Sequence, residues 1–128
     1  MKLARVGGRV AVARLDGDAP LPAWATAALA SAPLASVTRT EDELSIVCAD
    51  DAVPADARAA RDFVALRIVG TIALGTVGVL SALTAPLAAA GVPVFALSTF
   101  DTDYMLVRAV DLPRARAALA TVADVTGV

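Results

Sequence analysis

The fold is decided by the stretch from Gly75 to Val107, which reads GTVGVLSALTAPLAAAGVPVFALSTFDTDYMLV. It opens with a glycine-rich loop, continues with an apolar segment of helix length, and ends with two apolar runs of strand length. The two runs flank a polar turn from Ser98 to Asp103. A helix that begins at a glycine-rich loop, followed by such a turn, predicts a small-ligand pocket at the mouth of a sheet and no catalytic triad.

The rest of the second half follows from the same reading. Gly91 is well placed to close the helix, and Pro86 should bend it or end an early turn. Asp111 before Leu112 and Pro113 is typical of a helix N-cap. The expected elements are a loop over 75–78, a helix over 79–90, strands over 93–97 and 104–107, and a helix over 112–122.

The first half has the same order of elements. Alternating residues predict its first strand, an alanine-rich run predicts its helix, and acidic and proline residues mark the turns. The expected elements are a strand over 9–15, a turn over 16–18, a helix over 20–31, strands over 34–38 and 44–48 around a turn over 39–43, a polar connector over 49–54, a short helix over 55–61 and a strand over 63–72.

The two halves align without a gap at an offset of 60 residues. Thr40–Val47 then lies over Phe100–Val107, and Val12 lies over Ile72. We therefore predict two tandem β-α-β-β units, over residues 1–61 and 62–128. Neither unit alone is expected to bury a sheet face, so the two should share a core or pair edge to edge.

Composition limits the function. The chain has 128 residues, is 58% hydrophobic and has a formal net charge of -2. This excludes disorder and predicts one domain, or two very small ones. The arginines are scattered rather than clustered, which argues against nucleic acid as a partner.

Chemistry is limited as well. The chain has no histidine and one cysteine, Cys48, inside an apolar run. Cys48 is interpreted as a core residue rather than a nucleophile. A lone cysteine fits a reducing cytoplasm. The acidic turn Glu41–Glu43 is interpreted as solvated, and Asp101 with Asp103 as too few ligands for a metal. We expect no metal and no cofactor.

The uncharged stretch from Ile68 to Ser98 is long enough for a membrane span, which needs about 20 apolar residues. Its glycines and prolines divide it into pieces of strand and helix length, and no aromatic belt flanks it. We expect a buried α/β core and no membrane association.

Three segments together resemble the ACT family of small-molecule regulatory domains. They are SVTRTEDELSIVC (36–48), APLAAAGVPVFAL (85–97) and STFDTDYMLVRAVDL (98–112). The likeness is to tandem-ACT proteins related to aspartate kinase regulatory domains and to the cytosolic arginine sensor, and it covers roughly Leu34 to Val122. It implies an α+β fold with two ferredoxin-like β-α-β-β units, antiparallel sheets and helices packed on one face.

The resemblance also implies a site for an amino acid. In such domains the loop before the helix offers backbone groups to the amino and carboxylate ends of the ligand, and the turn offers side chains. Carried onto this chain, the loop is Leu74, Gly75, Thr76, Val77 and Gly78, and the turn residues are Ser98, Thr99, Phe100 and Asp103.

Some residues depart from the family pattern. Thr76 stands where the arginine sensor has an acidic residue, and Ala82 where its partner unit has a serine. Both weaken arginine as the ligand. The first-half turn has Thr40 where the second has Phe100, so a complete site would need a second copy.

The residues themselves are compatible with such a site. Gly75 and Gly78 allow close approach of backbone to a ligand, and helix N-terminal N–H groups favour a carboxylate. Asp103 suits an ammonium group, and Phe100 suits an aliphatic stem. The alternative is that these are ordinary turn and loop residues.

Three functions follow in order. The first is a non-enzymatic sensor that binds an amino acid and acts on a homodimer or a protein partner. The second is an assembly module with a vestigial site. The third, an enzyme using Asp101 and Asp103, has no nucleophile and no base to support it. Open sheet edges predict a homodimer.

Overall fold

The computed structural model describes residues 1–128 and has eight strands and three helices. The chain divides into two compact units. The N-terminal unit is Gly7–Phe63, and the C-terminal unit combines Met1–Val6 with Val64–Val128. The predicted α+β fold of two ferredoxin-like units is confirmed. The expectation placed residues 1–6 in the first unit, whereas they pack with the second.

The N-terminal unit is a four-stranded antiparallel sheet with one helix. Strands lie in the order β3, β4, β2, β5, and β2 pairs with β4 from Val10↔Ala49 to Asp16↔Glu43. Ala25 and Ala28 of the helix pack on Leu44, Ile46 and Cys48. Its elements are β2 (Val10–Asp16), α1 (Ala23–Ser31), β3 (Ser36–Arg39), β4 (Glu43–Ala49), a 3-10 turn (Asp50–Ala52) and the first part of β5 (Ala59–Ile68).

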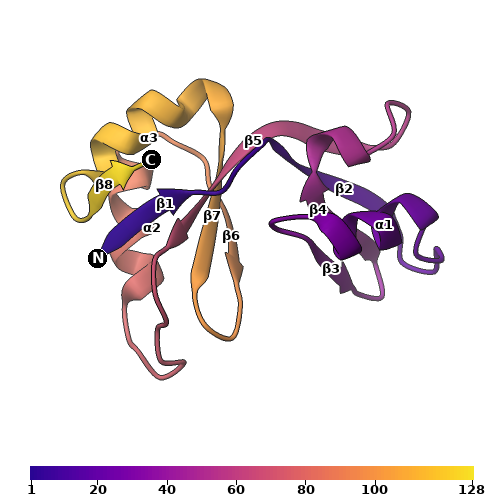
Figure 1. The fold of residues 1–128 in the computed structure, drawn as a ribbon, viewed down its shortest axis with the longest axis horizontal. Helices are drawn as coiled ribbons and strands as arrows, with labels where there is room; N and C mark the ends of the chain where they lie inside the picture. Colours follow the sequence, from indigo (N-terminus) through magenta and orange to yellow (C-terminus); the bar gives the residue numbers. More distant parts are fainter. The chain divides into compact units, whose positions relative to one another are not determined.

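The C-terminal unit has a five-stranded sheet and two helices. Strands lie in the order β6, β7, β5, β1, β8, and the two chain ends lie on neighbouring strands, β1 and β8 (Figure 1). Both helices contribute to one core through Leu83, Leu87, Ala115 and Leu119. The elements are β1 (Lys2–Arg5), the end of β5, α2 (Val79–Ala89), β6 (Phe95–Ser98), β7 (Asp103–Arg108), a 3-10 turn (Ala109–Asp111), α3 (Leu112–Leu119) and β8 (Asp124–Gly127).

Several local predictions were wrong. The helix expected over 55–61 is absent, because β5 begins at Ala59 and pairs with β2. Sheet pairing thus overrides the helix propensity of the alanines. Strands β1 and β8 were not expected, and they pair in parallel, so this sheet is not purely antiparallel. Both strands have four residues, which is too short for a reliable sequence pattern.

The expected helix ends also differ. Helix α2 continues through Pro86 to Ala89, and α3 ends at Leu119. The Asp111 side chain does not cap α3; its carboxylate accepts a 2.7 Å hydrogen bond from Arg114 instead. None of the helices combines the length and the apolar character that crossing a membrane requires.

Each unit has its own core, contrary to the expectation of a shared one. The residues of the two buried clusters come from separate units. Short β-α-β-β units achieve this because one helix face of alanines or leucines covers one sheet face.

The repeat is real in the two hairpins but its offset is 59 residues, not 60. The pair Arg39↔Leu44 closes the first hairpin, and Ser98↔Asp103 closes the second. Core residues agree with this offset, since Ile46 and Met105 are equivalent by it and both are buried. A one-residue slip would exchange the two faces of the strand.

Candidate functional site

A hollow of about 420 Å³ lies in the C-terminal unit, between the loop before α2 and the turn that joins β6 to β7. The loop side comes from residues 72–81, and the turn side from residues 98–103. Two backbone groups join the two sides, because the Ile72 N–H donates to the Asp101 carbonyl at 2.7 Å.

The loop side ends at the start of α2. Gly78 is the N-cap residue with a φ of 84°, a left-handed conformation that favours glycine. No side chain caps this helix end, and the first intrahelical bond there runs from the Ala82 N–H to the Gly78 carbonyl. The N–H groups of residues 79–81 therefore have no partner in the helix. All three residues line the hollow.

The turn side is held by its threonines. Thr99 Oγ1 accepts a bond from the Thr102 N–H at 3.3 Å, and the Thr99 N–H donates to the Thr102 carbonyl at 2.9 Å. Thr102 is buried, and its hydroxyl donates to the Ile68 carbonyl at 2.9 Å, which fixes the turn against the end of β5. The Ser98 hydroxyl donates to one carboxylate oxygen of Asp103.

Seven of the nine residues expected at the site line this hollow. They are Leu74, Thr76, Gly78, Ser98, Thr99, Phe100 and Asp103. Gly75 and Val77 do not, and the Val77 side chain is 95% exposed. Phe100 is 78% exposed, so its ring lies at the rim.

Six further lining residues were not named from the sequence. They are Ile72, Ala73, Val79, Leu80, Ser81 and Thr102. The helix start could have indicated residues 79–81, because unpaired N–H groups are expected there. Nothing in the sequence indicated Ile72 or Thr102, whose roles depend on contacts across the fold. Ala82 is not among the lining residues.

The electrostatics of the hollow are simple. Asp103 is its one charged side chain, and no lysine or arginine lines it. A negative group can be met by the N–H groups of the α2 start, and a positive group by Asp103. No group of three or more His, Cys, Asp or Glu side chains is arranged to hold a metal ion.

The N-terminal unit closes the equivalent place with its own chain. Arg39, equivalent to Ser98, donates to the carbonyls of Gly17 and Ala19 at 2.6 and 2.7 Å. Leu44, equivalent to Asp103, is 1% exposed in the core. The residue equivalent to Phe100 is Glu41 rather than Thr40, which corrects the alignment made from the sequence.

A family model for the ACT domain matches residues 58–121, half of the chain. The chain belongs to the ACT domain family. A second family model, for an N-terminal domain, matches residues 8–56. No curated protein sequence matches the chain.

Solved structures agree with this membership of the ACT family. A protein of Agrobacterium tumefaciens is 35% identical, over 97% of this chain and 90% of its own, with a TM-score of 0.88. The regulatory subunit of aspartate kinase from Thermus thermophilus is 14% identical over 95% and 97%, with a TM-score of 0.67. A putative C-terminal regulatory domain of aspartate kinase from Porphyromonas gingivalis is 20% identical over 94% of each chain, with a TM-score of 0.59. The predicted ACT likeness is confirmed, and the likeness to the two aspartate kinase domains is one of fold.

Proposed function

We propose that this ACT protein is a non-enzymatic regulator that binds an amino acid in the hollow of the C-terminal unit. The observation that carries the proposal is the pairing of uncapped helix N–H groups with one carboxylate across a hollow of about 420 Å³. An α-amino acid has one negative and one positive end, so it matches both groups. Ligand pockets of proteins have volumes of about 300 to 1,000 Å³.

Each part of the ligand has a matching group. The α-carboxylate would accept hydrogen bonds from the N–H groups of residues 79–81, at the positive end of the α2 dipole. The ammonium group would donate to the carboxylate oxygen of Asp103 that Ser98 leaves free. Phe100, exposed at the rim, would cover the side chain of the ligand.

The regulatory effect would come from a change in assembly. Strand β6 pairs with β7 on one side and leaves its other edge free, and edges of this kind pair with a second chain. We propose a homodimer, with a protein partner whose binding depends on the ligand. A ligand shifts such an equilibrium only if it binds one state more tightly. A cytoplasmic location fits the single unpaired cysteine.

An assembly module without a ligand is the second candidate. Leu74, Val77 and Phe100 are 71%, 95% and 78% exposed, and all three belong to the loop or the turn beside the hollow. Exposed apolar residues of this kind also suit a protein interface.

Isothermal titration calorimetry with the twenty amino acids separates the two candidates. We expect binding of one amino acid or of a few related ones, and a loss of at least about tenfold in affinity for Asp103→Asn, because a charge-assisted hydrogen bond is lost. Asp101→Asn is the matched control, because Asp101 lies in the same turn but does not line the hollow.

Two results would decide against the sensor. Absence of heat with every amino acid, in a protein that melts cooperatively, would favour the assembly module. Equal losses for Asp103→Asn and Asp101→Asn would place the ligand elsewhere.

A further inference from the structure

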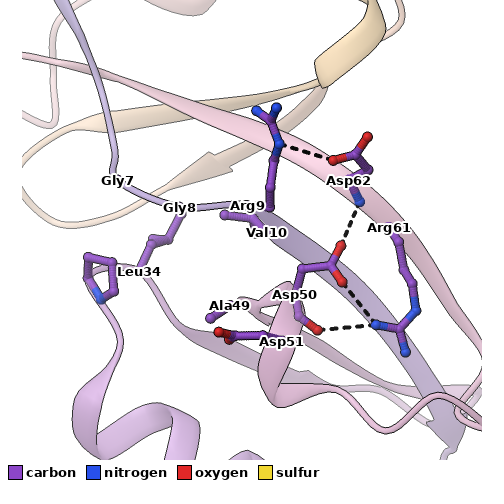
Figure 2. A pocket seen from close by; sticks show the side chains of 11 residues that line it. Gly7, Gly8, Arg9, Val10, Leu34, Ala49, Asp50, Asp51, Arg61 and Asp62 are labelled. Atoms are coloured by element: carbon purple, nitrogen blue, oxygen red, sulfur yellow. Dashed lines mark hydrogen bonds and ion pairs between the residues drawn. The ribbon is translucent and has the colours of Figure 1, made fainter.

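A second hollow, of about 690 Å³, lies wholly within the N-terminal unit (Figure 2). It is on neither the loop nor the turn that corresponds to the site proposed above. Its uncharged walls are formed by Gly7, Gly8, Val10, Pro33, Leu34 and Ala49. Its volume is within the range of about 300 to 1,000 Å³ that is usual for small-molecule sites.

A bulge in β5 shapes one side of this hollow. The pairing of β2 with β5 changes register between Val10↔Phe63 and Val12↔Ala60. Asp62 has a φ of 62°, which is uncommon for a residue other than glycine. Bulges re-aim side chains, and here Arg61 and Asp62 extend in different directions (Figure 2).

Asp50 holds this bulge in place. One of its carboxylate oxygens accepts a 3.0 Å bond from Arg61, and the other accepts a 2.7 Å bond from the Asp62 N–H. Arg61 also donates to the carbonyls of Val53 and Pro54 at 3.1 and 2.6 Å. The Asp62 carboxylate pairs with Arg9 at 3.0 Å. Both arginines of the hollow are therefore already engaged.

Asp51 is the one charged residue of the hollow without a partner. It takes part in none of the four ion pairs, and its carboxylate points away from Arg61 (Figure 2). With two arginines against three aspartates, the lining carries one excess negative charge. An apolar wall beside a free carboxylate is complementary to an organic cation.

We propose that this hollow binds a primary amine with a compact apolar body and no carboxylate. The ammonium group would pair with Asp51, and the apolar body would lie against Pro33 and Leu34. An amino acid fits less well here, because its carboxylate would meet the unpaired Asp51. The two units would thus recognise different ligands.

The test is a titration of the full chain by ¹H–¹⁵N correlation NMR with three indoles of matched shape. They are tryptamine, neutral 3-ethylindole and anionic indole-3-propionate. Tryptamine should shift the amides of Gly7, Gly8 and Asp51 and bind most tightly, and indole-3-propionate should bind least. Absence of these shifts at millimolar tryptamine, or equal affinity for the three, would overturn the proposal.

Variants assign the charge. Asp51→Asn should weaken tryptamine binding about fivefold, the upper range for an exposed ion pair, and leave 3-ethylindole unchanged. Asp56→Asn is the matched control, an exposed aspartate outside the hollow. Equal effects of the two variants, or an equal effect of Asp51→Asn on both indoles, would overturn the role of Asp51.

A second variant tests the cavity. A Cβ atom at Gly7 would meet no atom within 4 Å, and its φ is outside the left-handed region, so Gly7→Leu should fold and occupy the hollow. It should abolish the binding of tryptamine and of 3-ethylindole. Unchanged binding would contradict the location. Shifts at Thr99 and Phe100 on addition of amino acids report the C-terminal site separately, so the two proposals fail independently.

Discussion

The two hairpins of the protein have the same turn chemistry but differ in what lies beside the turn. Thr40 and Thr99 each accept a backbone N–H bond from within their own turn. In the N-terminal unit Arg39 and Leu44 fill the space before the helix, whereas in the C-terminal unit Ser98 and Asp103 leave a hollow. Two side chains per hairpin therefore decide whether the same fold closes or offers a pocket.

The largest effect is expected where the core closes the N-terminal turn. Leu44→Ala should lower the free energy of unfolding by about 3 kcal/mol, because it leaves a cavity in the core. The equivalent change, Asp103→Ala, should alter stability by less than about 0.5 kcal/mol. Urea denaturation of both variants measures the difference. Similar losses at the two positions would contradict the closed and open assignment.

The loops before the helices provide the second test. A Cβ atom at Gly17 would collide with the Glu41 carbonyl, so Gly17→Ala should cost about 2 kcal/mol. Gly75 has open space and no positive φ, so Gly75→Ala should be neutral or stabilise by about 0.5 kcal/mol. Thermal unfolding of the two variants compares them. An unaffected Gly17→Ala protein would show that the N-terminal loop is not tightly held.

The third test concerns the polar closure. Arg39→Met removes two hydrogen bonds to the carbonyls of Gly17 and Ala19 but keeps an extended apolar side chain. We expect a loss of about 1 kcal/mol in stability. Ser98→Ala should change stability by less, and should reduce the affinity of any ligand held by Asp103. Chemical denaturation and calorimetry would measure the two, and a larger stability loss for Ser98→Ala would reverse the comparison.

The smallest effect is expected at the equivalent core positions Cys48 and Val107, both fully buried. Burial, followed by the nearby Asp50 and Asp51, raises the pKa of the Cys48 thiol above its ordinary value of 9.0. The folded chain thus holds this proton more tightly than the unfolded chain. Its contribution to stability is complete below pH 9.0 and is lost as the pH rises through the folded pKa.

Cys48→Val copies the C-terminal residue and removes this titration. It should change stability by less than about 1.5 kcal/mol at pH 7 and should lose less stability than the parent between pH 8 and pH 10. Urea denaturation at the three pH values tests this. Identical pH profiles would mean that the thiol does not titrate differently on folding.

The sequence predicted the central elements well because their patterns are long or strongly marked. Helix α2 begins at the expected residue, Val79, and strands β4 and β7 lie within a residue of their expected bounds. It failed over 55–61, where helix-forming alanines are recruited into β5, and at β1 and β8, which are stabilised by pairing with distant strands. It also misplaced the repeat by one residue, because weak identity cannot fix register.

The sequence by itself determined the fold family, the helix that begins at a glycine and the polar turn, since these depend on local preferences and on hydrophobic periodicity. Only the tertiary structure decided which residues surround the hollow. The Thr102 hydroxyl reaches the Ile68 carbonyl, and the Ile72 N–H reaches Asp101, across separations of about thirty residues. Tertiary structure likewise decided that Arg39 and Leu44 close one unit, while Asp50, Arg61 and a bulge open another hollow within it. Such contacts depend on register and sheet order, which no local pattern specifies.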